Sequence, residues 1–566
     1  MGSVGLNFGS PTSGQGFDVA TTVSSIVANL KNIETPWQTQ LTTLKNQDTA
    51  LTTIGTDLSA LNTALTSLTD FQGVLASKEG SSSNTNVLSL TSASTTAVAG
   101  SHTVVVGSLA TTASYYSDSV ASANDIVTGS FTVTSGSSTY TIAAGSGGES
   151  LTALVSTINS AGAGVTASLV NGTSGAELTI VSNTSGSAGN FTLAGTLTDT
   201  SHGNATINLG HVGQSGADAS LTVDDIPVTS ASNTVTNAIQ GVTFQLLSAA
   251  SASPVQVEIT NNNSSVESAV GAFVSAYNTV VGDLNTQEGN NSSGSPEPLF
   301  GDPTISTLQE SLASALNFIQ PAQAVGSSTT IASADTLSGT INISVGGATA
   351  IPVTVGAGGT AATVAGLAAA INATSGIGVT ASVITSGTAS TLSLTGATSG
   401  SAGAISIDSS GLTDVTSSTG ISFASSQSNA VTNATQLGIT TNNDGTLAFD
   451  ATTLDSLLNT NYTDVVNFLQ PSGAFTSFGG NFTNALSNLG NSGPDGVVYL
   501  ALQQDQSEET NLNTNITNEN AQISTEQSNL TTELNQANYE LQAIPSQLTE
   551  INEIYSSISG YNQNAS

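Results

Sequence analysis

The side chains best suited to acid–base chemistry or metal binding are three histidines and one pair of adjacent aspartates. The histidines are His102, His202 and His211, and the last two lie close together in a Gly- and Asn-rich stretch. Two histidines can hold a metal, but no other ligand stands beside them, so we favour a solvated loop. Asp224 and Asp225 could act as a carboxylate pair, yet they separate two alternating stretches and are better explained as a turn.

No other motif supports catalysis. The chain has no cysteine, hence no thiolate nucleophile, disulfide or Cys-ligated metal. It has no Gly-x-Ser-x-Gly elbow and no P-loop, and residues 442–450 offer oxygen ligands without the spacing of an EF-hand. Trp37, the only tryptophan, falls on an apolar helical face, where packing explains it. We therefore predict that the protein is not an enzyme and has no catalytic, cofactor-binding or metal site.

The charge balance excludes several classes of partner. The chain has 3 basic residues, Lys31, Lys45 and Lys78, against 38 acidic ones, and a net charge of −35. Nucleic-acid binding needs clustered cations, as does docking on anionic lipid, so we expect neither nucleic acid nor a membrane surface as partner. The first ten residues lack the features of a Sec-type signal, and no apolar run is long enough to span a membrane.

The most regular pattern in the chain is a heptad near its C-terminus, over residues 513–558. Its two apolar positions predict a helix packed on another helix in a coiled coil. Amides at the first positions are costly when buried but fix register, unless that half of the helix is solvated. The first positions are Asn513, Asn520, Gln527, Leu534, Leu541, Leu548 and Tyr555, and the second are Ile516, Ile523, Leu530, Ala537, Ile544, Ile551 and Ile558.

A matching helical pattern lies at the N-terminus. Asp18 can cap a helix that carries Val19, Val23, Ile26, Leu30 and Ile33, and Pro36 suits the first turn of a second helix. That second helix carries a longer apolar stripe, and we expect the two ends of the chain to pair. The stripe consists of Leu41, Leu44, Leu51, Ile54, Leu58, Leu61, Leu65 and Leu68.

Two prolines divide this predicted pairing. Pro545 removes a helical hydrogen bond and should kink or restart the C-terminal helix, as Pro36 does at the other end. We expect residues 513–544 to pack against 37–68 and residues 546–558 to lie with 19–33 as a docking segment. The predicted coiled-coil seam is Leu41, Leu44, Leu51, Leu58, Leu61, Leu65, Leu68, Ile516, Ile523, Leu530, Leu534, Leu541 and Ile544. The predicted docking residues are Val19, Val23, Ile26, Leu30, Leu548, Ile551 and Ile558.

Between the two ends the chain contains a duplicated β-rich module, at residues 129–193 and 339–407. Each copy has alternating strands, a short helix ending in Ile-Asn, the sequence Gly-Val-Thr-Ala-Ser and the hexapeptide Thr-Ser-Gly-Ser-Ala-Gly. Identical peptides at matching offsets indicate two copies of one ββαββ-like unit. Amphipathic helices are expected at 266–284, 308–319 and 454–469, and Asn443-Asp444-Gly445 predicts a tight turn.

Four stretches resemble the flagellar filament cap proteins, also called the hook-associated protein type two family. They are Gly16-Phe17-Asp18-Val19 with Glu34 and Pro36; residues 221–244; residues 272–278 with 299–304; and Leu437-Gly438-Ile439-Thr440 with Asp444-Gly445-Thr446-Leu447 and Asp450. The duplicated modules resemble a repeat of flagellins and hook-associated proteins. Together these stretches cover most of the chain, although the second module interrupts the family's C-terminal region.

The resemblance implies an α+β multidomain fold, in which the terminal helices form an antiparallel coiled-coil leg and the β-rich domains form a head or plate. It implies a structural cap at the distal end of the bacterial flagellar filament, where exported flagellin is inserted and folded and is kept from being lost. Its implied partners are other copies of itself in a ring, commonly a pentamer, together with flagellin, the hook–filament junction protein and an export chaperone. The implied location is the extracellular tip, reached through the flagellar type III pathway without a cleaved signal peptide.

These expectations divide the chain into ten segments. They are terminal-helix segments at 1–36 and 545–566; leg helices at 37–77 and 501–544; head parts at 78–127 and 216–263; inserted modules at 128–215 and 321–432; a helical leg part at 264–320; and a leg–head connection at 433–500.

Other classes stay open at this point. Another flagellar axial protein, such as flagellin or the junction protein, would share the terminal helices and the repeat but lack residues 272–278 and 299–304. A secreted β-rich adhesin would need an export signal and no matched ends. A polysaccharide-cleaving enzyme would need a cleft with positioned carboxylates.

Overall fold

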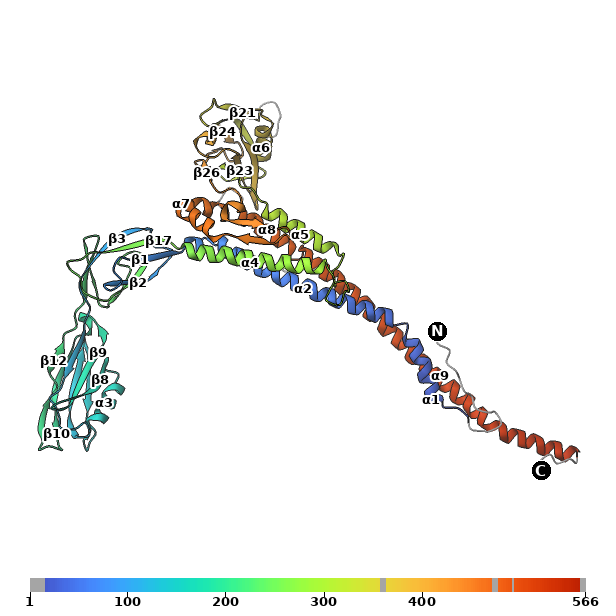
Figure 1. Cartoon of the computed structure of the whole chain (residues 1–566), viewed down its shortest axis with the longest axis horizontal. Coiled ribbons are helices and arrows are strands. Elements are labelled where there is room, and N and C mark those ends of the chain that lie inside the picture. The colour runs from blue at the N-terminus through green and yellow to red at the C-terminus, as the bar shows by residue number, and fades with distance from the viewer. Residues whose placement is uncertain (1–15, 357–362, 471–476, 491–492, 560–566) are drawn as a thin grey trace. The chain divides into compact units, whose positions relative to one another are not determined.

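The computed structural model describes residues 16–356, 363–470, 477–490 and 493–559, and it combines helices and sheets, as predicted (Figure 1). The chain forms two compact units. One is Asp70–Val266, and the other joins Met1–Thr69 to Glu267–Ser566.

The unit Asp70–Val266 contains two separate hydrophobic cores. The first lies between the sheets β1-β17-β3-β13-β14 and β15-β16-β2, and the second between β11-β10-β5-β6, with β7 beside β5, and β12-β4-β9-β8. The elements are η1 (Val74–Ala76), β1 (Lys78–Ser82), β2 (Leu88–Ala93), β3 (Gly100–Ser108), β4 (Thr112–Tyr116), β5 (Ile126–Ser135), β6 (Ser138–Ala143), β7 (Glu149–Ser150), α3 (Leu151–Ser160), β8 (Val165–Gly172), β9 (Gly175–Ser185), η2 (Ser187–Gly189), β10 (Phe191–Asp199), β11 (Ala205–Asn208), β12 (His211–Gln214), β13 (Ala219–Val223), β14 (Ile226–Ser230), β15 (Thr234–Thr236), β16 (Val242–Leu246) and β17 (Val255–Asn261).

Asp224 and Asp225 form the tight turn of the hairpin β13–β14, as predicted. Their φ angles are 50° and 64°, which matches the mirror-image turn that suits the twist of a hairpin. Asp224 also ties the turn to β3, because its Oδ1 accepts the Thr103 N–H at 2.8 Å and its Oδ2 lies 2.7 Å from His102 Nδ1. These two contacts hold the pKa of Asp224 below its usual range, with the His102 hydrogen bond as the larger cause.

The unit that joins the two ends of the chain contains most of the helices and the second β-rich module. Its helices are α1 (Val19–Lys31), α2 (Thr35–Thr69), α4 (Asn263–Gln287), which begins in the other unit, α5 (Pro303–Leu316), α6 (Val364–Ala373), η3 (Ser401–Gly403), η4 (Ala434–Leu437), α7 (Ala451–Leu469), α8 (Phe478–Leu489) and α9 (Val497–Ser559). Its strands are β18 (Gln323–Gly326), β19 (Ile331–Ala332), β20 (Leu337–Val345), β21 (Ile351–Val355), β22 (Thr380–Ser386), β23 (Ala389–Gly396), β24 (Ile405–Asp414), β25 (Thr419–Gly420), β26 (Gln427–Ser428), β27 (Ile439–Thr441) and β28 (Leu447–Phe449).

The two β-rich modules share an order of elements. β5–β6–α3–β8–β9–η2–β10 in the first corresponds to β20–β21–α6–β22–β23–η3–β24 in the second, and each module packs its helix onto its own core. The asparagine of the shared Ile-Asn peptide makes the same pair of hydrogen bonds in both modules. Asn159 accepts the Ala167 N–H at 2.7 Å and donates to its carbonyl at 3.0 Å, and Asn372 does the same with Ala381 at 2.7 Å in both directions.

Steric constraints explain why both modules have glycine at two positions of the shared hexapeptide. Its third residue, Gly186 or Gly400, has a φ of 81° or 72°, a conformation that costs most other residues energy. Its sixth residue, Gly189 or Gly403, lies so close to the carbonyl of Thr184 or Thr398 that a Cβ would overlap the oxygen. Both glycines are therefore required by the same turn in both modules.

Local signals mark the helix boundaries as predicted. Asp18 accepts the Thr21 N–H at 3.1 Å at the start of α1, and Pro36 lies in the first turn of α2. The Asn443-Asp444-Gly445 turn joins β27 to β28. One expectation was too long: α5 ends at Leu316, and Ile319 lies beyond it with 73% of its surface exposed.

Aromatic side chains hold the helical core together. Phe273 of α4 meets Phe482 of α8 edge to face, with ring centroids 5.3 Å apart, and Phe468 of α7 stacks on Phe478 at 5.2 Å. Gly479 lies directly against Thr69, at the end of α2, and leaves no room for a Cβ. The end of α2 is thereby packed onto α8.

Two carboxylates face each other between α2 and α4. Burial, with a hydrogen bond to Asp283 and the charge of Asp283, raises the pKa of Asp57 to about 6. A raised carboxyl pKa means that the folded state binds a proton more readily than the unfolded chain. The pair therefore lowers stability above about pH 6, and this penalty disappears as the pH falls toward about 4.

We predict that Asp57→Asn stabilises the helical unit at neutral pH. The amide can bond Asp283 without a second charge, so the melting temperature should rise by about 1–3 °C at about pH 7.5 and be unchanged at about pH 4. Thermal unfolding followed by circular dichroism at the two pH values measures this. Glu526→Gln, which removes an exposed charge from α9, is the control and should have no such effect. A lower melting temperature for Asp57→Asn at neutral pH would contradict the prediction.

Candidate functional site

The two ends of the chain meet along α9. Both α1 and α2 contact it. Phe17, just before α1, donates its N–H to Asn538 Oδ1 at 2.8 Å, whereas Asp48, farther along in α2, lies beside Asp505 and Glu509. Later residues of the N-terminal helices thus lie beside earlier residues of α9, so the helices run antiparallel (Figure 1).

The predicted seam residues differ in burial between the two ends. Leu44, Leu51, Leu58, Leu61, Leu65 and Leu68 of α2 are buried, and Leu41 is half-buried. On α9, Ile523 is buried, and Ile516, Leu530, Leu534, Leu541 and Ile544 are half-buried. The α2 stripe is more buried because its second half lies in the helical core with α4 and α8, where more than one helix covers it.

The predicted register was wrong. The Phe17–Asn538 bond and the Asp48–Asp505 neighbourhood place residues 513–538 of α9 beside α1 and the start of α2, not beside 37–68. The seam residues Leu58, Leu61, Leu65 and Leu68 lie near the α8 end of α2 instead. A heptad identifies the apolar face of a helix but not which segment covers it, which explains the error.

The restart of the helix that was expected as one outcome at Pro545 does not occur. α9 runs without interruption from Val497 to Ser559, with Pro545 inside it. Pro545 removes one backbone hydrogen bond. Its own carbonyl still accepts the Thr549 Oγ1 hydrogen at 2.8 Å, so the next turn continues the helix.

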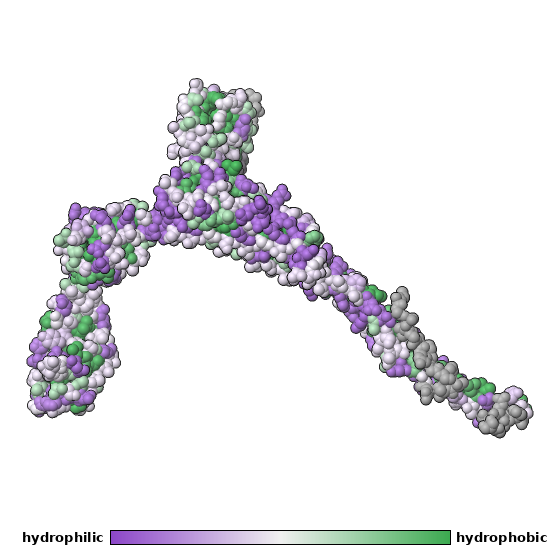
Figure 2. Space-filling view, viewed as in Figure 1, coloured by the Kyte–Doolittle hydropathy of each residue, from purple (hydrophilic) through white to green (hydrophobic). Residues whose placement is uncertain are grey.

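The end of α9 exposes a strip of large apolar side chains. The spacing of its members by three or four residues places them along one side of the helix. Figure 2 shows hydrophobic residues exposed near this end of α9. The members, with exposed fractions, are Leu548 42%, Ile551 59%, Ile554 58%, Tyr555 55% and Ile558 81%.

The docking residues predicted on the two ends therefore do not meet. Val19 and Val23 of α1 are buried and Ile26 and Leu30 are half-buried, whereas Leu548, Ile551 and Ile558 are exposed. Sequence reasoning missed Ile554, because it lies outside the heptad positions although it borders them on the helix surface.

Carboxylates gather where α2 crosses α9. Burial, together with the charges of Asp48, Asp302 and Glu508, raises the pKa of Asp505 to about 6. Burial and the charge of Glu509 raise the pKa of Asp48 in the same way. The helices therefore pack at this point in spite of their charges, and apolar contacts such as Leu44 and Leu51 must supply the attraction.

The histidines considered as a metal pair lie apart. His211 Nε2 contacts Asp118 Oδ1 at 2.7 Å, and His202 Nδ1 lies 3.2 Å and 3.3 Å from Oδ2 of Asp125 and of Asp199. His102 pairs with Asp224, as described above. Each histidine thus faces its own carboxylates, and no pair of histidines forms within the described residues.

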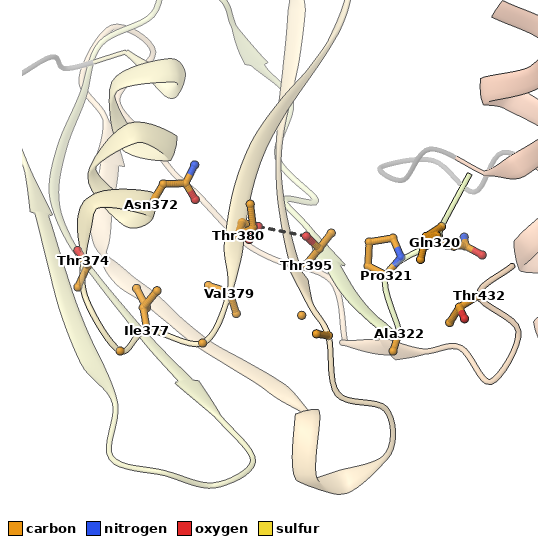
Figure 3. Close-up of a pocket in the computed structure, with 15 residues that line it drawn as sticks. Gln320, Pro321, Ala322, Asn372, Thr374, Ile377, Val379, Thr380, Thr395 and Thr432 are labelled. Carbon is orange, nitrogen blue, oxygen red and sulfur yellow. Dashed lines mark hydrogen bonds between the residues drawn. The ribbon is translucent and has the colours of Figure 1, made fainter. Parts of the chain in front are cut away.

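A cavity of about 630 Å³ opens where the second module joins the helices (Figure 3). Its walls come from the linkers at Ile319–Ala322 and Thr432 and from the module residues around α6, β22 and β23. No charged side chain lines it, and Figure 3 shows the Gln320 side chain turned away from the module. No acidic or basic side chain stands among its lining residues to activate the threonine hydroxyls there.

Within the described residues, no helix combines the length and apolarity needed to cross a membrane.

Two family models match the chain. The model described as Flagellar hook-associated protein 2 N-terminus matches residues 15–113, and the one described as Flagellar hook-associated protein 2 C-terminus matches 216–334 and 393–557. The C-terminal model alone accounts for about half of the chain. Residues 114–215 and 335–392, outside both matches, fall largely in the two β-rich modules.

Solved structures of flagellar cap proteins are also similar. The D1–D2–D3 domains of FliD from Escherichia coli are 19% identical, cover 81% of this chain and 99% of their own, and give a TM-score of 0.47. FliD from Pseudomonas aeruginosa PAO1 is 23% identical over 36% of this chain and 93% of its own, with a TM-score of 0.28. FliD from Bdellovibrio bacteriovorus is 17% identical over 31% and 99%, with a TM-score of 0.26.

No curated protein matches the chain at a significant level. The assignment of the chain to a family rests on the family models. They match the first helices, the hairpin β13–β14 and α9 in the order in which these occur along the chain. The chain belongs to the flagellar hook-associated protein 2 family.

Proposed function

We propose that this protein is the structural cap at the distal end of a bacterial flagellar filament, where it promotes ordered insertion and folding of exported flagellin and prevents flagellin loss. Family membership supports this role, and the absence of a catalytic constellation among the described residues suits a protein that makes and breaks no bond. The family models favour neither the axial-protein nor the adhesin alternative.

The single observation that carries the proposal is the exposed apolar strip at the end of α9. Fully burying one such side chain contributes about 1.5–3 kcal/mol, so five of them on one helix favour a partner surface. The strip lies on the helix that holds both ends of the chain together. We propose that this strip binds the end of the filament, where its partner is flagellin or the hook–filament junction protein.

The paired helices and the β-rich parts take different tasks in this proposal. The antiparallel coiled-coil leg consists of α1, α2 and α9, with residues 513–538 of α9 beside α1 and the start of α2, and the β-rich parts form the head and plate. The two modules are copies of the flagellin-type repeat. The ten segments predicted from the sequence serve as its domain boundaries, with residues 545–559 continuous with the leg helix.

Cap proteins must also meet their own copies and be delivered to the tip. We propose a homo-oligomeric ring, a pentamer as in the resemblance, at the extracellular end of the flagellum. Export through the flagellar type III pathway, with an export chaperone, would pass the unfolded chain without a cleaved signal. The lack of cysteine removes any disulfide that would hinder threading.

Deleting the gene tests the proposal directly. We expect the deletion strain to release flagellin monomers into the medium and to be non-motile in soft agar, and a plasmid copy to restore filaments. Immunoblots of cell and medium fractions measure the distribution of flagellin. Normal filaments in the deletion strain would exclude the cap function.

Replacing the apolar strip tests the docking role of α9. We predict that Ile551→Ser with Ile554→Ser and Ile558→Ser leaves the fold and secretion intact, because the replaced side chains are exposed, but reduces motility to the level of the deletion strain. Tyr539→Ser is the matched control, since Tyr539 is 73% exposed on α9 but faces another side. Full motility of the triple variant would refute the docking role.

The ring is tested by mass in solution. We expect light scattering of the concentrated protein to give a small, defined oligomer with the mass of a pentamer. A strictly monomeric mass at all concentrations would contradict self-assembly through this chain alone.

A further inference from the structure

Two buried aspartates and one histidine meet at one end of the first module. Asp125 precedes β5, and Asp199 is the last residue of β10. β5 and β10 pair antiparallel with Asp199 opposite Val127, which brings the two carboxylates to the same end of the sheet. Their exposed fractions are 7% and 3%.

The turn after β10 folds His202 back onto this pair. Asp199 Oδ1 accepts the N–H groups of Ser201 at 2.9 Å and of His202 at 3.2 Å. These bonds leave Asp199 Oδ2 free to face the imidazole, 3.3 Å from His202 Nδ1. Asp125 Oδ2 lies 3.2 Å from the same nitrogen and also accepts the Ser122 N–H at 2.8 Å.

One imidazole cannot satisfy both carboxylates. A single N–H hydrogen on Nδ1 can point at only one of the two Oδ2 atoms, so the other faces the same nitrogen without a hydrogen from it. The chain has three lysines and no arginine, and no ion pair among the described residues brings a lysine to Asp125 or Asp199. A small cation in place of the proton would satisfy all three groups.

The spacing of the three groups matches a metal ion. Zn²⁺ binds carboxylate oxygen and imidazole nitrogen at about 2.0–2.2 Å in a tetrahedron, which separates neighbouring ligand atoms by about 3.3–3.6 Å. The observed separations from His202 Nδ1 are 3.2 Å and 3.3 Å, and all three ligand atoms lie within 4.8 Å of one another. The imidazole side chain is 54% exposed, which leaves an entry path and a place for a water as fourth ligand.

The second module supplies a natural comparison. Asp335 and Asp414 occupy the matching positions, and Asp414 Oδ1 accepts the N–H groups of Thr416 and Ser417 at 2.9 Å and 3.2 Å. Ser417 stands where the first module has His202, and its hydroxyl donates to Asp414 Oδ2 at 2.7 Å. The carboxylate pair is thus built twice, but only the first copy adds a nitrogen ligand.

We propose that Asp125, Asp199 and His202 form a zinc site that ties the turn after β10 to the segment before β5. The mixture of one imidazole and two carboxylates favours Zn²⁺ over Ca²⁺, which prefers six or more oxygen ligands. The site goes beyond the cap function and does not depend on it.

The test uses the full chain, freed of metal with a chelator and titrated with ZnCl₂ by calorimetry. We expect one equivalent of Zn²⁺ to bind the wild type and no comparable binding of Ca²⁺. His202→Ser recreates the arrangement of the second module, so it should fold, and its affinity for Zn²⁺ should fall at least about tenfold. His211→Ser, which removes an exposed histidine that contacts Asp118 and Tyr116 but neither Asp125 nor Asp199, is the matched control and should bind as the wild type does.

Thermal unfolding provides a second measurement that separates loss of binding from loss of folding. Saturating Zn²⁺ should raise the melting temperature of the wild type and of His211→Ser but not of His202→Ser. Without metal the three proteins should melt alike. Unchanged zinc affinity in His202→Ser, or no binding of Zn²⁺ by the wild type at high micromolar concentration, would overturn the proposal.

Discussion

The pairing of the two chain ends along α9 is the contact on which the rest of the structure depends. α1 and α2 run antiparallel to α9. Residues 70–496 form the segment of the chain that connects these paired ends. The contacts between the two ends are therefore non-local, because nearly the whole chain separates the paired helices in the sequence. Among the described residues it also leaves one stretch of α9 exposed, since α9 extends past the bond between Phe17 and Asn538 and presents its apolar strip.

The shortage of cations shapes how this pairing is held. Ion pairs that commonly flank a helical seam need Lys or Arg, and the chain has three such residues. Carboxylates instead lie close together there, and burial with the charges of Asp48, Asp302 and Glu508 raises the pKa of Asp505 to about 6. Stability then rests on buried leucines and on the aromatic cluster of α4, α7 and α8. Exposed ion pairs contribute only about 0–1 kcal/mol each, so the loss is tolerable where the apolar contacts are extensive.

The sequence predicted what local chemistry determines. The cap at Asp18, the turn at Asp224 and Asp225, the two modules and the apolar stripes all follow from residue types at short spacing. The register along α9 did not follow, because many segments present a similar apolar stripe. At Pro545 the helix continues although proline removes a backbone hydrogen bond, so the residue type alone did not decide whether α9 restarts there. The cluster of Asp125, Asp199 and His202 was missed because strand pairing brings Asp125 to the turn that holds Asp199 and His202, and sequence spacing does not show that pairing.

Backbone hydrogen bonds also join the two ends of each β-rich module. At the first, Thr111 and Ala217 bridge through N–H to carbonyl bonds of 2.8 Å and 3.4 Å, so the entering and leaving strands touch. At the second, Gln320 donates to the Thr432 carbonyl at 2.7 Å and Asn429 to the Ala322 carbonyl at 2.8 Å. A module whose two ends meet can be inserted without moving the flanking chain. The N-terminal family match stops at residue 113 and the C-terminal match starts at 216, next to the first bridge, and the gap at 335–392 lies inside the second closure. The modules can therefore differ in their surface chemistry, as His202 and Ser417 do, while the host fold and its paired helices stay the same.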